Sequence, residues 1–177
     1  FCLFNWVAAA ARHARNKFGL GRVAVVDFDV HHGNGTQAAF WEDKDLFYAS
    51  SHQYPHYPGT GASGETGQGN IINVPLPAGT GSGVFRSRFA EHVFPALNEF
   101  KPELLLISAG FDAHADDPLA QLNLQDEDYG WVTDELLAIA DQHSGGRVVS
   151  ALEGGYDLGA LGRSVAIHVQ SLMQTGD

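Results

Sequence analysis

The chain has 177 residues, 44% of them hydrophobic, and a formal net charge of -11 at pH 7. This length supports one sizeable core, and the single cysteine, Cys2, excludes an internal disulfide framework. No apolar run approaches the ~20 residues of a membrane span, and the acidic balance argues against nucleic-acid binding and suits a cationic ligand. We therefore expect one cytoplasmic domain over residues 1–177, with no membrane or nucleic-acid partner.

Helical and strand patterns alternate along the chain. An alanine-rich helical pattern comes first and reaches about Phe18. The expected strands are 22–29, 46–50, 70–75, 103–109 and 147–152, and the later helices are 84–99, 126–143 and 157–174. This order predicts βαβ units in a three-layer α/β fold, with helices on both faces of a mainly parallel sheet. The strands at 103–109 and 147–152 are apolar enough to be fully buried.

The first strand ends in three alternating polar residues, Asp27, Asp29 and His31, which lead into a glycine turn. Side chains at positions i, i+2 and i+4 of a strand point to one face, so two carboxylates and an imidazole converge. Capping aspartates and a solvated histidine loop are the alternative. Because the three residues interrupt an apolar run, their desolvation favours a bound divalent cation such as Zn²⁺.

Two later strands also end in polar residues. Asp112 follows the strand at 103–109, and Tyr156 follows two glycines after the strand at 147–152. Since ligands gather at the carboxyl ends of parallel strands, Asp112 is a candidate to complete a set with Asp29 and His31 that leaves a position open, as a catalytic zinc requires. A capping role for Asp112 and a packing role for Tyr156 remain open at this point.

A long stretch of turn residues, 50–69, separates two of the strands. Such a loop in a small domain is typically a lid or a site wall. Its glycines match neither phosphate-binding pattern, so the sequence does not support nucleotide binding.

Four segments together resemble a known family. They are 26–37, 57–61, 109–119 and 153–156, and they read Val-Asp-Phe-Asp-Val-His-His-Gly-Asn-Gly-Thr-Gln, Tyr-Pro-Gly-Thr-Gly, Ala-Gly-Phe-Asp-Ala-His-Ala-Asp-Asp-Pro-Leu and Glu-Gly-Gly-Tyr. These segments look like the zinc-dependent deacetylases, which include histone deacetylases, bacterial histone deacetylase-like amidohydrolases, acetylpolyamine amidohydrolases and acetoin-utilisation proteins. Asn34 and the Glu-Gly-Gly-Tyr form are more similar to the class II and bacterial branch. The resemblance implies an arginase/deacetylase-like fold.

The resemblance also implies roles for individual residues. Asp29, His31 and Asp112 would bind Zn²⁺, and Tyr156 would stabilise the oxyanion of acetamide hydrolysis. A structural K⁺ would be held by Asp27, Asp29, His31, Ser50 and Ser51. Asp27 and Asn34 would each support one of two paired catalytic histidines. The substrate channel would be lined by Phe1, Tyr57, Phe111 and Leu119.

The sequence departs from the family pattern in one respect. The family's paired histidines, its general base and acid, lie upstream of the segment that begins here at Phe1. His31 is needed for the metal, and His32 is expected to point to the opposite face of the strand. We therefore expect the chain to be the C-terminal part of a deacetylase catalytic domain whose N-terminal portion is missing.

Several alternatives remain open from sequence. An arginase-like ureohydrolase would hold two manganese ions, but the matching positions are Gly33 and His114. A noncatalytic metal-binding fragment is another possibility, and the native metal could be Fe²⁺ instead of Zn²⁺. The substrate is expected to be an acetylated amine, either acetyl-lysine in a protein or an acetylpolyamine. The loop at 52–69 has only one acid, Glu65, to hold a second amine, which favours acetyl-lysine. A homo-oligomer, which could narrow the entrance, is a further option.

Overall fold

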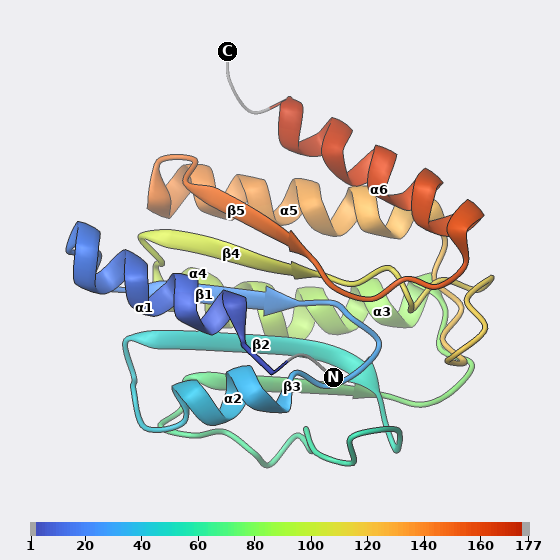
Figure 1. Ribbon diagram of the computed structural model, residues 1–177, viewed down its shortest axis with the longest axis horizontal. Coiled ribbons are helices and arrows are strands. Elements are labelled where there is room, and N and C mark those ends of the chain that lie inside the picture. The colour runs from blue at the N-terminus through green and yellow to red at the C-terminus, as the bar shows by residue number, and fades with distance from the viewer. Residues whose placement is uncertain (1–2, 175–177) are drawn as a thin grey trace.

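The computed structural model describes residues 3–174 and places five parallel strands in one sheet (Figure 1). The sheet order is β3-β2-β1-β4-β5. The strands are β1 (Val23–Asp27), β2 (Leu46–Gln53), β3 (Ile71–Leu76), β4 (Leu104–Ala109) and β5 (Val148–Leu152). Every expected strand is present, and the predicted three-layer α/β fold with a parallel sheet is confirmed.

Helices cover both faces of this sheet. One layer contains α1 (Trp6–Phe18) and α2 (Asn34–Phe40), and the other contains α3 (Ser82–Arg88), the π-helical segment η1 (Phe89–Val93), α4 (Phe94–Phe100) and α5 (Asp126–Ser144). Helix α6 (Leu158–Met173) packs on α5. Among the helices at residues 3–174, none combines the length and apolar character that crossing a membrane requires.

The sequence of β1 explains why the sheet is covered on both sides. Successive strand residues point to opposite faces, so Val23 and Val25 enter the core beneath α1, while Ala24 and Val26 enter the core on the other face. All five residues of β1 are buried, as a central parallel strand requires. The polar residues after β1 are therefore held on a rigid central element.

The structure differs from the sequence expectations in three details. Strand β5 is not fully buried, because no described strand pairs with its outer edge, and Val149 and Leu152 are 54% and 64% exposed. Helix α2 was not expected, because Gly33 and Gly35 at its start resemble turn residues. The helix expected at 84–99 runs from Ser82 to Phe100 as α3, η1 and α4.

Candidate metal centre

Asp29, His31 and Asp112 meet at the carboxyl ends of neighbouring strands. Asp29 and His31 follow β1, and Asp112 follows the adjacent β4. Because both strands are parallel, the segments that follow them leave the same edge of the sheet (Figure 1). One atom from each of these three residues lies within 4.8 Å of the other two, so the three expected residues lie together. Asp29, His31 and Asp112 are called the metal group below.

The spacing of these atoms suits a small divalent ion. His31 Nδ1 lies 3.1 Å from Asp29 Oδ1 and 3.1 Å from Asp112 Oδ2. Zinc bonds of 2.0–2.1 Å at a tetrahedral angle place neighbouring ligand atoms about 3.3 Å apart. The three side chains therefore need little movement to hold Zn²⁺ and leave a fourth position open.

Backbone donors orient both carboxylates. Asp29 Oδ1 accepts the N–H of His31, and Asp29 Oδ2 accepts the N–H of Gly154, both at 2.8 Å. Asp112 Oδ1 accepts the N–H of Val30 at 2.8 Å, which leaves Asp112 Oδ2 facing His31. Partners of this kind fix the orientation of metal ligands. The Gly154 bond also ties the loop after β5 to the site.

Two glycines allow the chain to pack this closely. A Cβ on Gly110 would collide with the Asp29 side chain, and a Cβ on Gly154 would collide with the carboxylates of Asp112 and Asp29. Any larger residue at either position would push a carboxylate out of place. The glycines of the Ala-Gly-Phe-Asp and Glu-Gly-Gly-Tyr motifs thus serve the geometry of the Asp-His-Asp group.

The electrostatics of the group also favour a cation. Burial, together with the Asp29 charge, raises the pKa of Asp112 to about 6. Hydrogen bonds to Asp112 and Asp29 raise the pKa of His31 to about 10. One hydrogen on His31 Nδ1 cannot satisfy two carboxylates well, whereas a divalent ion among the three side chains would neutralise both. The donor set therefore fits a metal.

Asp27 lies behind this group and contacts β2. Its Oδ1 accepts the N–H of Asp29 at 3.1 Å, and its Oδ2 accepts the Tyr48 hydroxyl at 2.9 Å. Burial, together with the nearby Asp29 charge, raises the pKa of Asp27 well above its usual value. Ser50 is directly opposite Asp27 in the β1–β2 register, and its hydroxyl contacts His52 at 2.9 Å. Tyr48 was not expected at this site, although its alternation with Ser50 in β2 places both on one face.

Aromatic side chains flank His31 on its outer side. The Tyr57 ring is 59% exposed and lies 6.4 Å from the His31 ring, centroid to centroid. The His56 ring, which was not expected, stacks on His31 at 5.3 Å. Leu119 and Tyr156 are also exposed, in the loops after β4 and β5.

The remaining expected residues lie elsewhere. Phe111 does not line a channel, because its ring is buried in the core, 5.0 Å from the Tyr129 ring. It directly precedes Asp112, whose carboxylate contacts His31, while the Phe111 ring packs in the core. Asn34 is exposed at the start of α2, and Phe1 is outside the described residues.

His32 points away from the metal group. Its Nδ1 lies 2.7 Å from the Thr60 hydroxyl, and its Nε2 lies 3.0 Å from Gln37 Oε1. The ring is buried beneath the loop that follows β2. His32 therefore anchors this loop and is not oriented towards Asp29, His31 and Asp112.

The two-manganese alternative lacks its extra ligands in this geometry. Gly33 has no side chain, and His114 Nε2 lies 3.1 Å from Asp126 Oδ1. Asp126 in turn bonds Arg163 at 2.7 Å, so the His114 cluster joins α5 to α6. Neither of these two positions thus supplies a ligand for a second metal ion beside Asp29, His31 and Asp112.

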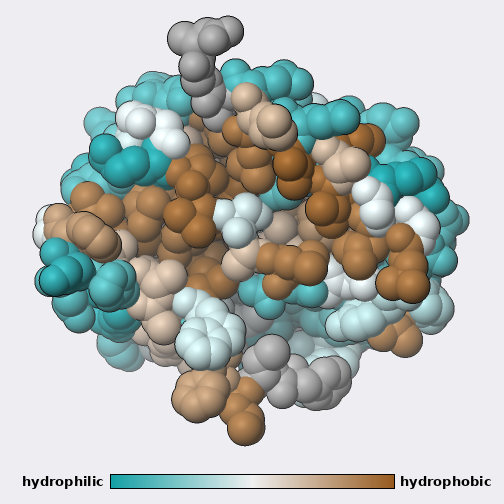
Figure 2. Space-filling view, turned by 45° about the horizontal axis from the view of Figure 1, so that its top comes forward, coloured by the Kyte–Doolittle hydropathy of each residue, from teal (hydrophilic) through white to brown (hydrophobic). Residues whose placement is uncertain are grey.

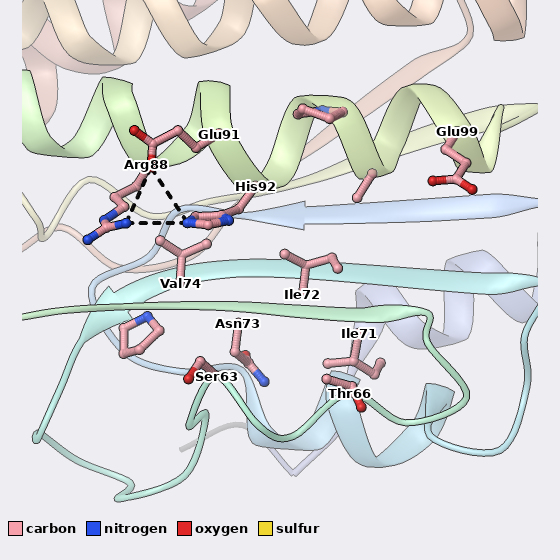
Figure 3. A pocket seen from close by; sticks show the side chains of 13 residues that line it. Ser63, Thr66, Ile71, Ile72, Asn73, Val74, Arg88, Glu91, His92 and Glu99 are labelled. Atoms are coloured by element: carbon pink, nitrogen blue, oxygen red, sulfur yellow. Dashed lines mark hydrogen bonds and ion pairs between the residues drawn. The ribbon is translucent and has the colours of Figure 1, made fainter.

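A groove of about 640 Å³ lies at the β3 edge of the sheet, apart from the metal group (Figure 3). Figure 3 shows Arg88, Glu91 and His92 contacting one another on its helical wall. Glu91 lies 3.3 Å from Arg88 and 3.7 Å from His92, so the charges on this wall largely pair with one another. The groove shares none of the residues expected at the active site.

Comparisons with known proteins agree with this arrangement. A family model described as the histone deacetylase domain matches residues 1–172. Histone deacetylase 10, chloroplastic, from Oryza sativa subsp. japonica is 49% identical over 94% of this chain and 38% of its own length. The histone deacetylase-like amidohydrolase of Pseudomonas aeruginosa is 42% identical over 88% of this chain and 42% of its own length.

Solved structures show the same fold. The structure of the histone deacetylase Clr3 superposes with a TM-score of 0.90 at 38% identity, covering 97% of this chain and 30% of that one. The chain thus spans less than half of the length of each of these relatives. With the family model matching nearly every residue, the chain belongs to the histone deacetylase family.

Proposed function

We propose that this chain forms the metal-binding part of a deacetylase catalytic domain that hydrolyses acetylated amines. The observation that carries the proposal is the convergence of Asp29, His31 and Asp112, with the rings of Tyr57 and His56 lying against His31. Membership of the histone deacetylase family supports the reaction class.

Asp29, His31 and Asp112 would hold Zn²⁺, which when bound supplies a Lewis acid for the acetamide carbonyl and makes a bound water more acidic. Tyr156 would donate its phenolic hydrogen to the oxygen on which negative charge develops. Tyr57 would contact the aliphatic part of the substrate, and Leu119 would lie at the rim. Both are exposed on loops that leave the carboxyl edge of the sheet.

A structural K⁺ is part of the same proposal. Asp27 and Ser50 are paired in register across β1 and β2, and Ser51 is the next residue of β2. Carbonyls of Asp29, His31 and Ser51 would complete its oxygen ligands. The buried Asp27 carboxylate, whose pKa is raised, would gain a compensating charge from such an ion.

We further propose that more of the domain packs against β5. The edge of this strand is apolar and exposed, and Figure 2 shows apolar side chains gathered over the face that carries β5 and α6. The only adjacent histidines in the chain are His31 and His32, and neither is placed as a general base. The paired catalytic histidines would therefore come from the remainder of the domain, with this chain as its C-terminal part.

The preferred substrate is acetyl-lysine in a peptide or protein. Glu65, the only acid of the 52–69 loop, accepts hydrogen bonds from Gln37 at 2.6 Å and from the backbone of Ala62 at 3.0 Å. Because the loop itself uses this carboxylate, it is poorly placed to bind the second amine of a polyamine. The acidic surface would still attract a cationic substrate.

The test compares two substrates with the complete protein, purified with and without zinc. We expect zinc-dependent release of acetate, with kcat/KM for an acetyl-lysine peptide above that for acetylputrescine. A specificity constant at least about tenfold higher for acetylputrescine would overturn the substrate assignment. Absence of turnover on both substrates in zinc-loaded protein would overturn the proposed activity.

A further inference from the structure

Asp117 is a buried carboxylate outside the metal group that joins two loops of the site. It lies in the loop after β4 and is 7% exposed. Its Oδ2 accepts the backbone N–H of Tyr156 at 2.8 Å, from a residue 39 positions along the chain. Its Oδ1 accepts the backbone N–H of Leu119 at 2.9 Å. One carboxylate thus binds the backbones of both the proposed oxyanion donor and the proposed rim residue.

The loop that carries Tyr156 needs such an anchor. Up to Gly154 the segment after β5 is held against the segment after β4, since the Phe111 N–H donates to the Gly154 carbonyl at 2.8 Å. Gly155 follows with φ +139°, a conformation that L side chains rarely adopt. The Tyr156 side chain is half-exposed. The bond from the Tyr156 N–H to Asp117 holds the backbone directly after this glycine.

Asp117 is itself firmly held. Its N–H donates to the His114 carbonyl at 3.0 Å, and the buried His114 ring stacks on Tyr129 with the ring planes 13° apart. Asp126 contacts the same imidazole at 3.1 Å. The carboxylate is thus fixed to the body of the domain through α5, and it transmits that rigidity to Tyr156.

We propose that Asp117 is a positioning residue that holds Tyr156 in place for transition-state stabilisation and holds Leu119 at the rim. The inference rests on the proposed function, because it acts through the Tyr156 hydroxyl. A hydrogen bond from an N–H to a buried carboxylate is stronger than one to a neutral acceptor. Misplacing a reacting group by about 1 Å is enough to lower a rate by on the order of 100-fold.

The first experiment measures Asp117→Asn in the complete, zinc-loaded protein. The amide replaces one acceptor oxygen by an NH₂ group, so one of the two backbone donors loses its partner. We expect kcat on an acetyl-lysine peptide to fall by on the order of 10-fold to 100-fold, with KM and zinc content nearly unchanged. Asp116→Asn is the matched control, since its side chain is 57% exposed and contacts Arg163, and it should leave kcat unchanged.

The same substitution in a Tyr156→Phe background separates positioning from general stability. If Asp117 acts through the Tyr156 hydroxyl, Asp117→Asn should lower kcat by less than about twofold once that hydroxyl is gone. An equal fractional loss in both backgrounds would overturn the proposal. So would loss of zinc in Asp117→Asn, because the residue would then be acting on the metal group.

Amide exchange of the unmodified protein provides a test that needs no variant. The Tyr156 and Leu119 amides should exchange much more slowly than the amide of Gly64 in an exposed turn. Exchange of the Tyr156 amide as fast as that of Gly64 would show that Asp117 does not hold it. If instead wild type and Tyr156→Phe turn over equally, the proposed role of Tyr156 fails, while exchange still reports whether Asp117 anchors the loop.

Discussion

His31 and His168 both lie in polar clusters, but the partners of the two imidazoles differ in charge. His31 faces two carboxylates, and the hydrogen bonds to Asp112 and Asp29 raise its pKa to about 10. His168 lies at the contact of α6 with α5 and β5, where hydroxyls of Thr133 and Ser150 meet its ring nitrogens at 2.7 Å and 2.8 Å. Burial lowers the pKa of His168 to about 4.

The His168 cluster is complete without any ion. The Thr133 hydroxyl donates to the Tyr129 carbonyl, so His168 Nδ1–H donates to Thr133 and the Ser150 hydroxyl donates to Nε2. A neutral imidazole satisfies every group there. Around His31, two carboxylates share one imidazole, which leaves negative charge uncompensated. His168 is buried and the His31 side chain is 26% exposed, but only the His31 cluster contains the paired carboxylates that favour a cation.

Removing one carboxylate from the His31 cluster should have the largest effect. Asp112→Ala should lower zinc affinity by more than about 100-fold, because an open three-ligand set cannot spare a member. Asp116→Ala in the same loop is the control and should bind zinc as wild type does. Metal content after dialysis checks both variants. Equal zinc content in Asp112→Ala and Asp116→Ala would contradict the role of Asp112 as a ligand. It would also remove the contrast drawn between the His31 and His168 clusters.

Tyr156→Phe should have the next largest effect and shows whether the chemistry extends beyond the metal ligands. In the complete protein we expect kcat to fall by on the order of 100-fold, as loss of one oxyanion donor typically does, with zinc retained. Steady-state kinetics with parallel metal analysis makes the comparison. A rate close to wild type would assign Tyr156 to packing.

His168→Gln should affect stability and leave zinc binding intact. The folded-state pKa of His168 is about 4 against an ordinary value of 6.5, so the unfolded chain takes up the proton first as pH falls. The stability from neutral His168 is full above pH 6.5 and is lost towards pH 4, by roughly 3 kcal/mol in total. Urea unfolding across this range should show a shallower pH dependence for His168→Gln. Parallel curves for the two proteins would contradict the assignment.

Short-range patterns predicted much of the site and fold. Asp29 and His31 follow from the alternation of side chains in one strand, and Asp112 follows from the parallel arrangement of strand ends. The order of strands and helices was sufficient for the fold class. Each of these inferences needs only neighbouring residues or a general rule of topology.

Contacts between distant segments could not be predicted in this way. Tyr48 reaches Asp27 across 21 residues, and Asp117 reaches Tyr156 across 39, and a local pattern does not identify the partner in either pair. The exposure of β5 depends on which strand lies beside it, and an apolar sequence does not reveal that. Phe111 shows the same limit, because a motif names neighbouring residues without saying which of them faces the core.

The most direct test of the metal centre is calorimetric zinc titration of the metal-free chain at pH 7, in two buffers of different ionisation enthalpy. His31, with a pKa of about 10, carries a proton at this pH, and zinc binds the neutral imidazole. We predict about one zinc bound and about one proton released per chain, with both signals lost in Asp112→Ala. Saturation without proton release, or no saturable site near one zinc per chain, would contradict the Asp29, His31 and Asp112 assignment.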